Sequence, residues 1–264
     1  MMIRIAVILL ALAFSAKAEI LVQPHAYPSG FSVVLKLASE LCEALPDCYS
    51  GQLNSKAVAF QTQQFPVVAP VTTTEETRAT RQVCFSAGFI DMVNHICHAK
   101  AIDRIEPGYF DSYVKNLAQL CASDPLAAAP NIVSPRYWKD DVMNDQLSYF
   151  NQVIGFVTAL NLSHHYLGHY AKYASNIAGP GQLAAPINKF LTATEWEGSV
   201  RAGAVDALNC ALATDGPRAL FDAIDRMPQR PLWAAYIVPQ QVDIKSLNKQ
   251  LADYETLFFR GGLR

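Results

Sequence analysis

Three of the six histidines of this chain lie in the short segment HHYLGH, from His164 to His169. Residues four apart lie one turn above each other on the same face of a helix. If the segment is helical, His165 and His169 both reach one ion, whereas His164 points about 100° away around the axis. Imidazole nitrogens are common ligands of zinc. The spacing therefore predicts that His165 and His169 chelate one metal ion.

A catalytic zinc site needs a third protein ligand. The downstream segment TATEWEGSVRAG contains two carboxylates, Glu195 and Glu197. These are roughly 200° apart around a helix, so only one of them faces the histidines. The residues three, four and seven positions after Glu195 are all small, namely Gly198, Ser199 and Ala202. Because a small face lets two helices approach closely, we choose Glu195 as the third ligand.

The segment HYLGH resembles the HELGH form of the HExxH motif of zinc metallopeptidases, with four of five positions identical. EWEGS, which begins at Glu195, is similar to the Glu–aromatic–x–Ala–Asp segment of gluzincins of the CAAX prenyl protease and heat-shock-protease type. The flanking segments PNIVSPRYWKDDVMNDQLSYF and ATDGPRALFDAIDRM follow the order of that family. The resemblance covers about Asn131 to Met227. It implies a gluzincin-like helical core with zinc as cofactor on His165, His169 and Glu195.

The chain departs from this family at two positions. Tyr166 stands where the family has the glutamate that activates the metal-bound water, and Ser199 replaces an aspartate that supports the ligand glutamate. The tyrosine hydroxyl has an ordinary pKa of about 10, which is far above the pKa suited to a general base at neutral pH. Helical geometry directs Glu197 and His164 away from the ion. A proton-transfer group contributes about 10²–10⁴-fold to a rate. We therefore expect an impaired or inactive pseudoenzyme, and we assign no catalytic residue.

Each of these residues also has a structural interpretation. In this interpretation His165 and His169 are buried in a helical core, where they form hydrogen bonds with Tyr170 or Tyr173 as partners. The segment TATE, which ends at Glu195, matches a capping box, in which the glutamate bonds back to a backbone N–H. Tyr166 is then a packing aromatic. Under this alternative the chain is a non-catalytic helical envelope protein with structural histidines that acts through protein binding.

The elements that must position these residues are mostly helices. Apolar residues recurring at threes and fours predict a long helix from about Asp145 to Tyr173, ended by the Gly-Pro-Gly segment at 179–181. Further helices are expected at 31–45, 106–122, 194–213, 218–227 and 243–259. One strand is expected at 19–23. A second strand is expected to lead into a helix over 82–102, whereas 60–80 is expected to be a loop. The predicted fold class is α+β, predominantly helical, with a gluzincin-like core and a small β component.

The N-terminus has the pattern of a secretory signal peptide. Arg4 precedes an apolar core from Ile5 to Phe14, and Ala16-Lys17-Ala18 is a small-x-small cleavage site. We expect a signal peptide at 1–18, an N-terminal helical segment and linker at 19–80, and a metallopeptidase-like helical domain at 81–264. The protein is then exported, to a periplasm or to the outside of the cell.

Composition narrows the class of partner. The chain of 264 residues is 51% hydrophobic and 17% charged, with a net charge of −2, which is typical of an ordered globular protein. It has no Lys/Arg cluster, so we expect no nucleic-acid partner. After the signal peptide no apolar run is long enough for a membrane span. The metallopeptidase resemblance implies peptides or proteins as substrates or partners. Six cysteines in an oxidising compartment predict disulfides, with Cys42 and Cys48 as the favoured pair.

Overall fold

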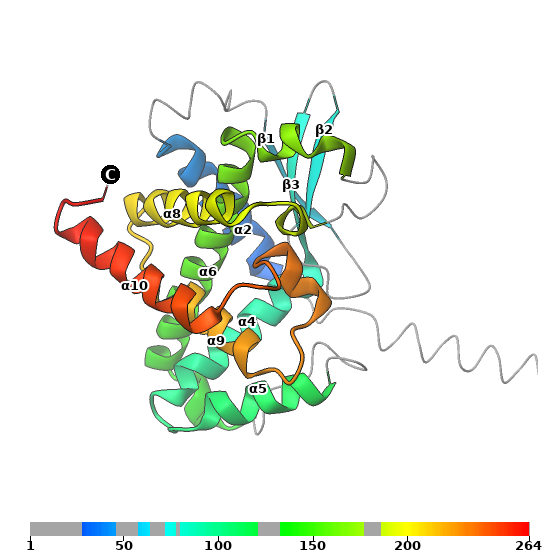
Figure 1. The fold of residues 1–264 in the computed structure, drawn as a ribbon. Coiled ribbons are helices and arrows are strands. Elements are labelled where there is room, and N and C mark those ends of the chain that lie inside the picture. The colour runs from blue at the N-terminus through cyan, green and yellow to red at the C-terminus, as the bar shows by residue number, and fades with distance from the viewer. Residues whose placement is uncertain are drawn as a thin grey trace, which may run out of the picture.

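The computed structural model describes residues 28–45, 58–63, 72–77, 80–120, 133–176 and 186–263 (Figure 1). In this part the fold is predominantly helical with one small sheet, which confirms the predicted fold class. The helices are α2 (Pro28–Glu43), α4 (Ala87–Asp103), α5 (Tyr109–Leu120), α6 (Asp140–Tyr166), α7 (His169–Lys172), α8 (Ala193–Asn209), α9 (Asp215–Arg226) and α10 (Ile244–Phe259). Short 3₁₀ turns lie at Pro135–Trp138, Ala174–Asn176, Ile187–Lys189 and Leu232–Tyr236. The strands are β1 (Val58–Gln63), β2 (Thr72–Thr77) and β3 (Thr80–Ser86).

Helix α6 is the centre of this arrangement. It packs against α2, α4, α8 and α9, and α10 lies across α8 and α9 (Figure 1). Every residue of α6 from Val153 to Tyr166 is buried, so this half of the helix is buried on all sides and not along a single stripe. Three polar side chains within this buried stretch donate to carbonyls of the same helix, in the pairs Thr158–Ile154, Asn161–Val157 and Ser163–Leu160. These bonds let a mixed sequence be buried all round.

The sheet corrects the loop expected over 60–80. Its order is β1-β3-β2, with β1 parallel and β2 antiparallel to β3. All of β2 and most of β1 fall in the expected loop, so that prediction was wrong for these residues. β2 has the sequence TTTEET, so four of its six residues are threonine, and β-branched threonine fits a pleated strand. β2 pairs with β3 locally, in the register Thr77–Thr80, whereas β1 pairs with β3 across a long stretch of chain.

The two parts predicted on either side of residue 80 share one sheet and one core. β1 and β2 precede that position and pair with β3, and α2 packs on α4 and α6. Apolar residues of α2 such as Val34 and Leu41 belong to the same hydrophobic cluster as α6 and α8. The predicted signal peptide, the strand at 19–23 and the Gly-Pro-Gly segment lie outside the described residues.

Helices α6 and α8 approach each other at a glycine. A Cβ placed on Gly203 would lie 3.0 Å from both the N and the Cα of Leu160. Four residues earlier on α8, the carbonyl of Ser199 accepts a hydrogen bond from Ser163 Oγ at 3.3 Å. The close approach expected from the small residues of this helix is therefore present. It runs through Ser199 and Gly203, whereas Gly198 faces open space.

Replacing Gly203 with alanine tests this contact. Because the added methyl group meets backbone atoms that cannot rotate away, Gly203→Ala should lower the free energy of unfolding by about 1–3 kcal/mol. The matched control is Gly198→Ala in the same helix, where nothing lies within 4 Å of the new Cβ. The control should be neutral or stabilising by up to about 1 kcal/mol, because alanine is the better helix former. Urea denaturation of both variants measures the difference, and equal stability would contradict the close approach.

Candidate functional site

The histidine segment is not one continuous helix. α6 ends at Tyr166 and α7 begins at His169, and between them Gly168 has a φ of +78°. This left-handed conformation suits glycine and is a common way to end a helix. The N–H of Gly168 donates to the carbonyl of His165 at 3.1 Å, which closes the helix end. The expected helix through Tyr173 is wrong at this point, and the four-residue spacing does not place His165 and His169 on one helical face.

Three polar atoms meet where α7 and α8 contact the end of α6. The Nδ1 atoms of His164 and His169 lie 3.2 Å apart. Ser199 Oγ lies 3.1 Å from the first and 3.3 Å from the second, and it also donates to the carbonyl of Glu195 at 3.0 Å. All three side chains are buried. The structure therefore contains a buried, hydrogen-bonded histidine pair, with His164 in the place expected for His165.

Burial determines the charge of this pair. It lowers the pKa of His164 well below its ordinary value, with smaller contributions from the neighbouring histidines. It also lowers the pKa of His169. A neutral imidazole carries one N–H, so in the contact between the two Nδ1 atoms one donates and the other accepts. The pair is therefore neutral at pH 7.

His165 points to a different neighbour. Its ring lies against the ring of Tyr170, with the centroids 4.5 Å apart and the planes tilted by 34°. The hydroxyl of Tyr170 reaches Asn161 Oδ1 at 3.5 Å, and Asn161 is itself buried. Tyr170 was one of the two partners expected in the structural interpretation. Here the contact between His165 and Tyr170 is made by packed rings.

Glu195 is engaged in a capping box at the start of α8. Its Oε2 accepts from the N–H and the hydroxyl of Thr192 at 2.9 and 2.8 Å, and from the hydroxyl of Tyr173 at 2.9 Å. Its Oε1 pairs with Lys172 Nζ at 2.7 Å. The hydrogen bond from Lys172, helped by Thr192 and Tyr173, lowers the pKa of Glu195 to about 2. The capping box predicted as the alternative role of Glu195 is confirmed.

The predicted zinc ligands do not fit an ion as they are arranged. His165 lies against Tyr170, His169 contacts His164, and both oxygens of Glu195 have protein partners. No group of three His, Cys, Asp or Glu side chains is placed to hold a metal within the residues that the structure describes. Zinc on His165, His169 and Glu195 requires new positions for these side chains and stays a prediction.

Tyr166, at the position of the family's general base, contacts a carboxylate that the sequence analysis did not select. Its hydroxyl donates to Asp206 Oδ2 at 2.8 Å. Both side chains are buried, and burial raises the pKa of Asp206 to about 6. Asp206 lies between the apolar Val205 and Ala207 on α8. An acidic residue inside an apolar helical run is the one sequence feature that indicates it.

The structure describes only one of the two cysteines of the favoured disulfide pair. Cys42, Cys97 and Cys210 are free thiols in this structure, and Cys48, the predicted partner of Cys42, lies outside the described residues. Burial raises the pKa of all three thiols, to about 11 for Cys42 and Cys210 and higher for the fully buried Cys97. These three thiols are therefore protonated at neutral pH. The Cys42–Cys48 pairing stays a prediction.

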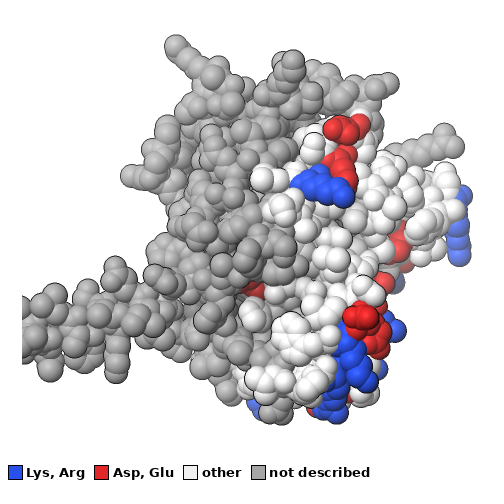
Figure 2. Space-filling view, turned by 180° about the vertical axis from the view of Figure 1, so that it is seen from behind, with Lys and Arg blue, Asp and Glu red and all other residues white. Residues whose placement is uncertain are grey.

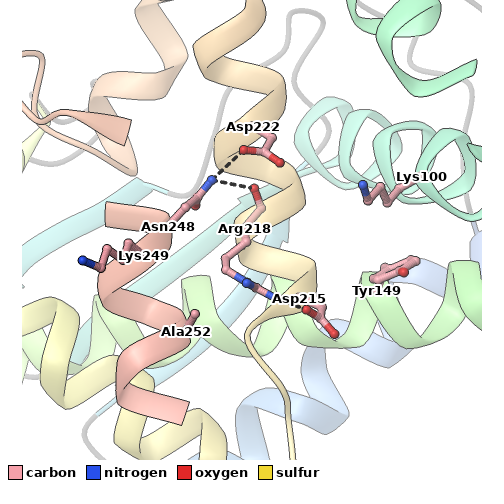
Figure 3. A pocket seen from close by; sticks show the side chains of 8 residues that line it. All are labelled: Lys100, Tyr149, Asp215, Arg218, Asp222, Asn248, Lys249 and Ala252. Carbon is pink, nitrogen blue, oxygen red and sulfur yellow. Dashed lines mark hydrogen bonds and ion pairs between the residues drawn. The ribbon is translucent and has the colours of Figure 1, made fainter. Parts of the chain in front are cut away.

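A polar pocket of about 420 Å³ lies between α4, α6, α9 and α10 (Figure 3). The ion pair of Arg218 and Asp215 lies at its centre, with Asn248 on one side and Tyr149 on the other (Figure 3). Asn248 donates to Asp222 Oδ1 at 2.6 Å and to the carbonyl of Arg218 at 3.4 Å. The complete lining is Lys100, Tyr149, Asp215, Arg218, Asp222, Asn248, Lys249 and Ala252. The spacing of residues along the chain does not indicate this pocket, because its charged residues resemble an ordinary solvated helix face.

The surface carries both signs of charge. Seen from behind, lysines and arginines lie beside aspartates and glutamates, and uncharged side chains cover wide areas of the described surface (Figure 2). Among the helices that the structure describes, none has the length and apolarity needed to cross a bilayer.

Asp206 makes stability depend on pH in a specific direction. Its pKa is about 6 in the folded chain against an ordinary value of 3.8. The folded state thus binds more protons between these values, and stability falls as pH rises through the window, by roughly 3 kcal/mol in total. Asp206→Asn, which removes the buried charge, should be more stable than the parent at pH 7 and equal to it near pH 4. Thermal melts of both proteins across this range measure the difference, and a gain that does not change with pH would contradict the assignment.

Comparison with known proteins gives no relative for this chain: no family model, no curated protein and no solved structure matches it. The gluzincin resemblance therefore depends on the quoted motifs alone.

Proposed function

We propose that this chain is an exported, non-catalytic helical protein that acts by binding other molecules, and that its histidine segment has a structural role. The observation that carries the proposal is that the two groups a peptidase would need have other partners. Tyr166, in the position of the general base, donates to Asp206, and Glu195, the proposed third ligand, caps α8 and pairs with Lys172.

No other group replaces the missing base. His164 is buried and neutral, and its Nδ1 contacts His169 and Ser199. Glu197 is exposed on the opposite side of α8 from the buried Ser199. A group that transfers a proton must lie within hydrogen-bond reach of the water that it activates. Neither residue meets that condition for an ion shared by His165 and His169.

The histidine contacts also have a clear structural use. They join α7 to the end of α6 and to α8, three elements that meet at Ser199. The ion pair of Lys172 and Glu195 adds a second link between α7 and α8. Hydrogen bonds among buried groups of this kind specify one packing arrangement, because any other leaves polar atoms unpaired.

Metal binding of metallopeptidase ancestry is the second candidate. It is favoured by one observation, the meeting of two neutral imidazole Nδ1 atoms and a hydroxyl within 3.3 Å of one another. Neutral imidazole is the form that binds zinc. Zinc on the predicted set also requires Glu195 to give up its contacts with Thr192 and Lys172.

Metal analysis separates the two candidates. Purified, untagged protein should contain far less than one zinc per chain, and a chelator should leave its melting temperature unchanged. Glu195→Gln serves as the matched variant, since glutamine also completes a capping box. The free energy of unfolding of this variant should fall only by the contribution of the lost ion pair with Lys172, about 1 kcal/mol or less. A stoichiometric metal that is lost in both His169→Ala and Glu195→Gln would instead establish the zinc site.

Restoring the family's glutamate tests catalysis directly. Tyr166→Glu should show no peptidase activity with added zinc, and it should be destabilised, because the new carboxylate lies against buried Asp206. Tyr166→Phe is the control that removes only the hydroxyl, at an expected cost of about 1–3 kcal/mol. Peptide hydrolysis by the glutamate variant that a chelator abolishes would overturn the proposal and show an intact site that lacks only its base.

A further inference from the structure

The pocket between α4, α6, α9 and α10 contains polar atoms that the protein itself does not satisfy. Arg218 Nε and Asn248 Oδ1 are both buried, and neither has a hydrogen-bond partner in the described part of the chain. The first is a donor and the second an acceptor. Buried polar atoms in native proteins are nearly always paired, so an unpaired donor and acceptor on one pocket point to a ligand that supplies both partners.

The amide of Asn248 has a fixed orientation. Its Nδ2 faces two acceptors, Asp222 Oδ1 and the carbonyl of Arg218. A flipped amide would direct its oxygen at the same two oxygens and lose both bonds, so Oδ1 is the atom left for a ligand. Arg218 is oriented in a similar way, because its Nη2 pairs with Asp215 and leaves Nε.

The charges around the pocket are mixed. Arg218 and Asp215 lie at its centre, and Lys100 and Tyr149 approach from α4 and α6 (Figure 3). Lys100 has no carboxylate within ion-pair distance among the described residues and lies over the ring of Phe110 at 5.1 Å. The ammonium of Lys249 points away from this group (Figure 3). A ligand that carries both a carboxylate and an ammonium matches a pocket that is lined by both cations and carboxylates.

We propose that this pocket binds a small zwitterion with the chemistry of a free amino acid. The ligand carboxylate accepts from Arg218 Nε and the Lys100 ammonium. The ligand ammonium donates to Asn248 Oδ1 and to Asp215. A volume of about 420 Å³ is sufficient for such a molecule. Tyr149 and His164 are fifteen residues apart on α6, about 22 Å at 1.5 Å per residue, so the pocket is separate from the histidine segment.

Calorimetric titration with glycine, L-alanine, L-glutamate and L-lysine tests the proposal. At least one amino acid should bind with a submillimolar Kd. Propionate and n-propylamine, which each carry only one of the two charged groups, should bind at least about tenfold more weakly. Binding of propionate as tight as that of the best amino acid would overturn the zwitterion assignment, and so would the absence of any amino-acid binding.

Two variants locate the binding. Arg218→Lys keeps a cation beside Asp215 but removes the Nε–H, and Asn248→Ala removes the acceptor. Each should weaken binding at least about tenfold while the circular dichroism spectrum stays that of the parent. Lys245→Ala is the control, because Lys245 is exposed on the same helix and does not line the pocket. Parental affinity in both pocket variants would place the binding elsewhere and overturn the proposal. None of these measurements depends on zinc, so they stand apart from the tests of the histidine segment.

Discussion

The approach of α8 to α6 is the constraint on which the centre of the molecule depends. At Gly203 the two backbones are so close that a Cβ would lie 3.0 Å from backbone atoms of Leu160, and at Ser199 a hydroxyl of α6 reaches the carbonyl of α8. Ser199, Asp206 and the end of α6 are all brought together by this contact. The polar groups there must bond to each other, because water is excluded and an unpaired buried group costs about 1–3 kcal/mol. The histidine contacts and the bond between Tyr166 and Asp206 are two results of that one approach.

Burial shifts the pKa values of the two histidines and of Asp206 in opposite directions. It lowers the pKa of His164 and His169, so their contribution to stability is present above pH 6.5 and is lost as pH falls below it. It raises the pKa of Asp206, whose cost to stability is present above about pH 6 and disappears toward pH 3.8. Between these limits acidification therefore weakens the histidine contacts and relieves the strain at Asp206. The two contributions to stability have opposite signs, so they partly cancel in the pH dependence of the parent protein.

How much the sequence predicted depends on whether the deciding contact is local. The helices ending at Glu43 and Phe259, and the capping box of Glu195, follow from periodicity and from residues three apart, and these predictions were confirmed. The break at Gly168 was missed, because a single glycine within a helical pattern is often tolerated. β1 was missed because its strand form depends on pairing with β3, which is distant along the chain. β2 pairs with β3 locally, and it was missed because its run TTTEET contains no apolar residue. The contact partners of Glu195 and Tyr166 depend on which residues of other elements lie beside them, and spacing along the chain does not contain that information.

The polar atoms named at the histidine end of α6 and those at the pocket offer a ligand different opportunities, and this difference bears on function. At the histidine end, the Nδ1 atoms of both contacting imidazoles, the hydroxyl of Ser199 and both oxygens of Glu195 have partners within the protein. A ligand arriving there must break existing bonds and gains little in return. At the pocket, Arg218 Nε and Asn248 Oδ1 are already removed from water and have no partner. A ligand that pairs with them gains hydrogen bonds without a further cost of desolvating these protein atoms, so binding is favoured at the pocket and structural stability at the histidines.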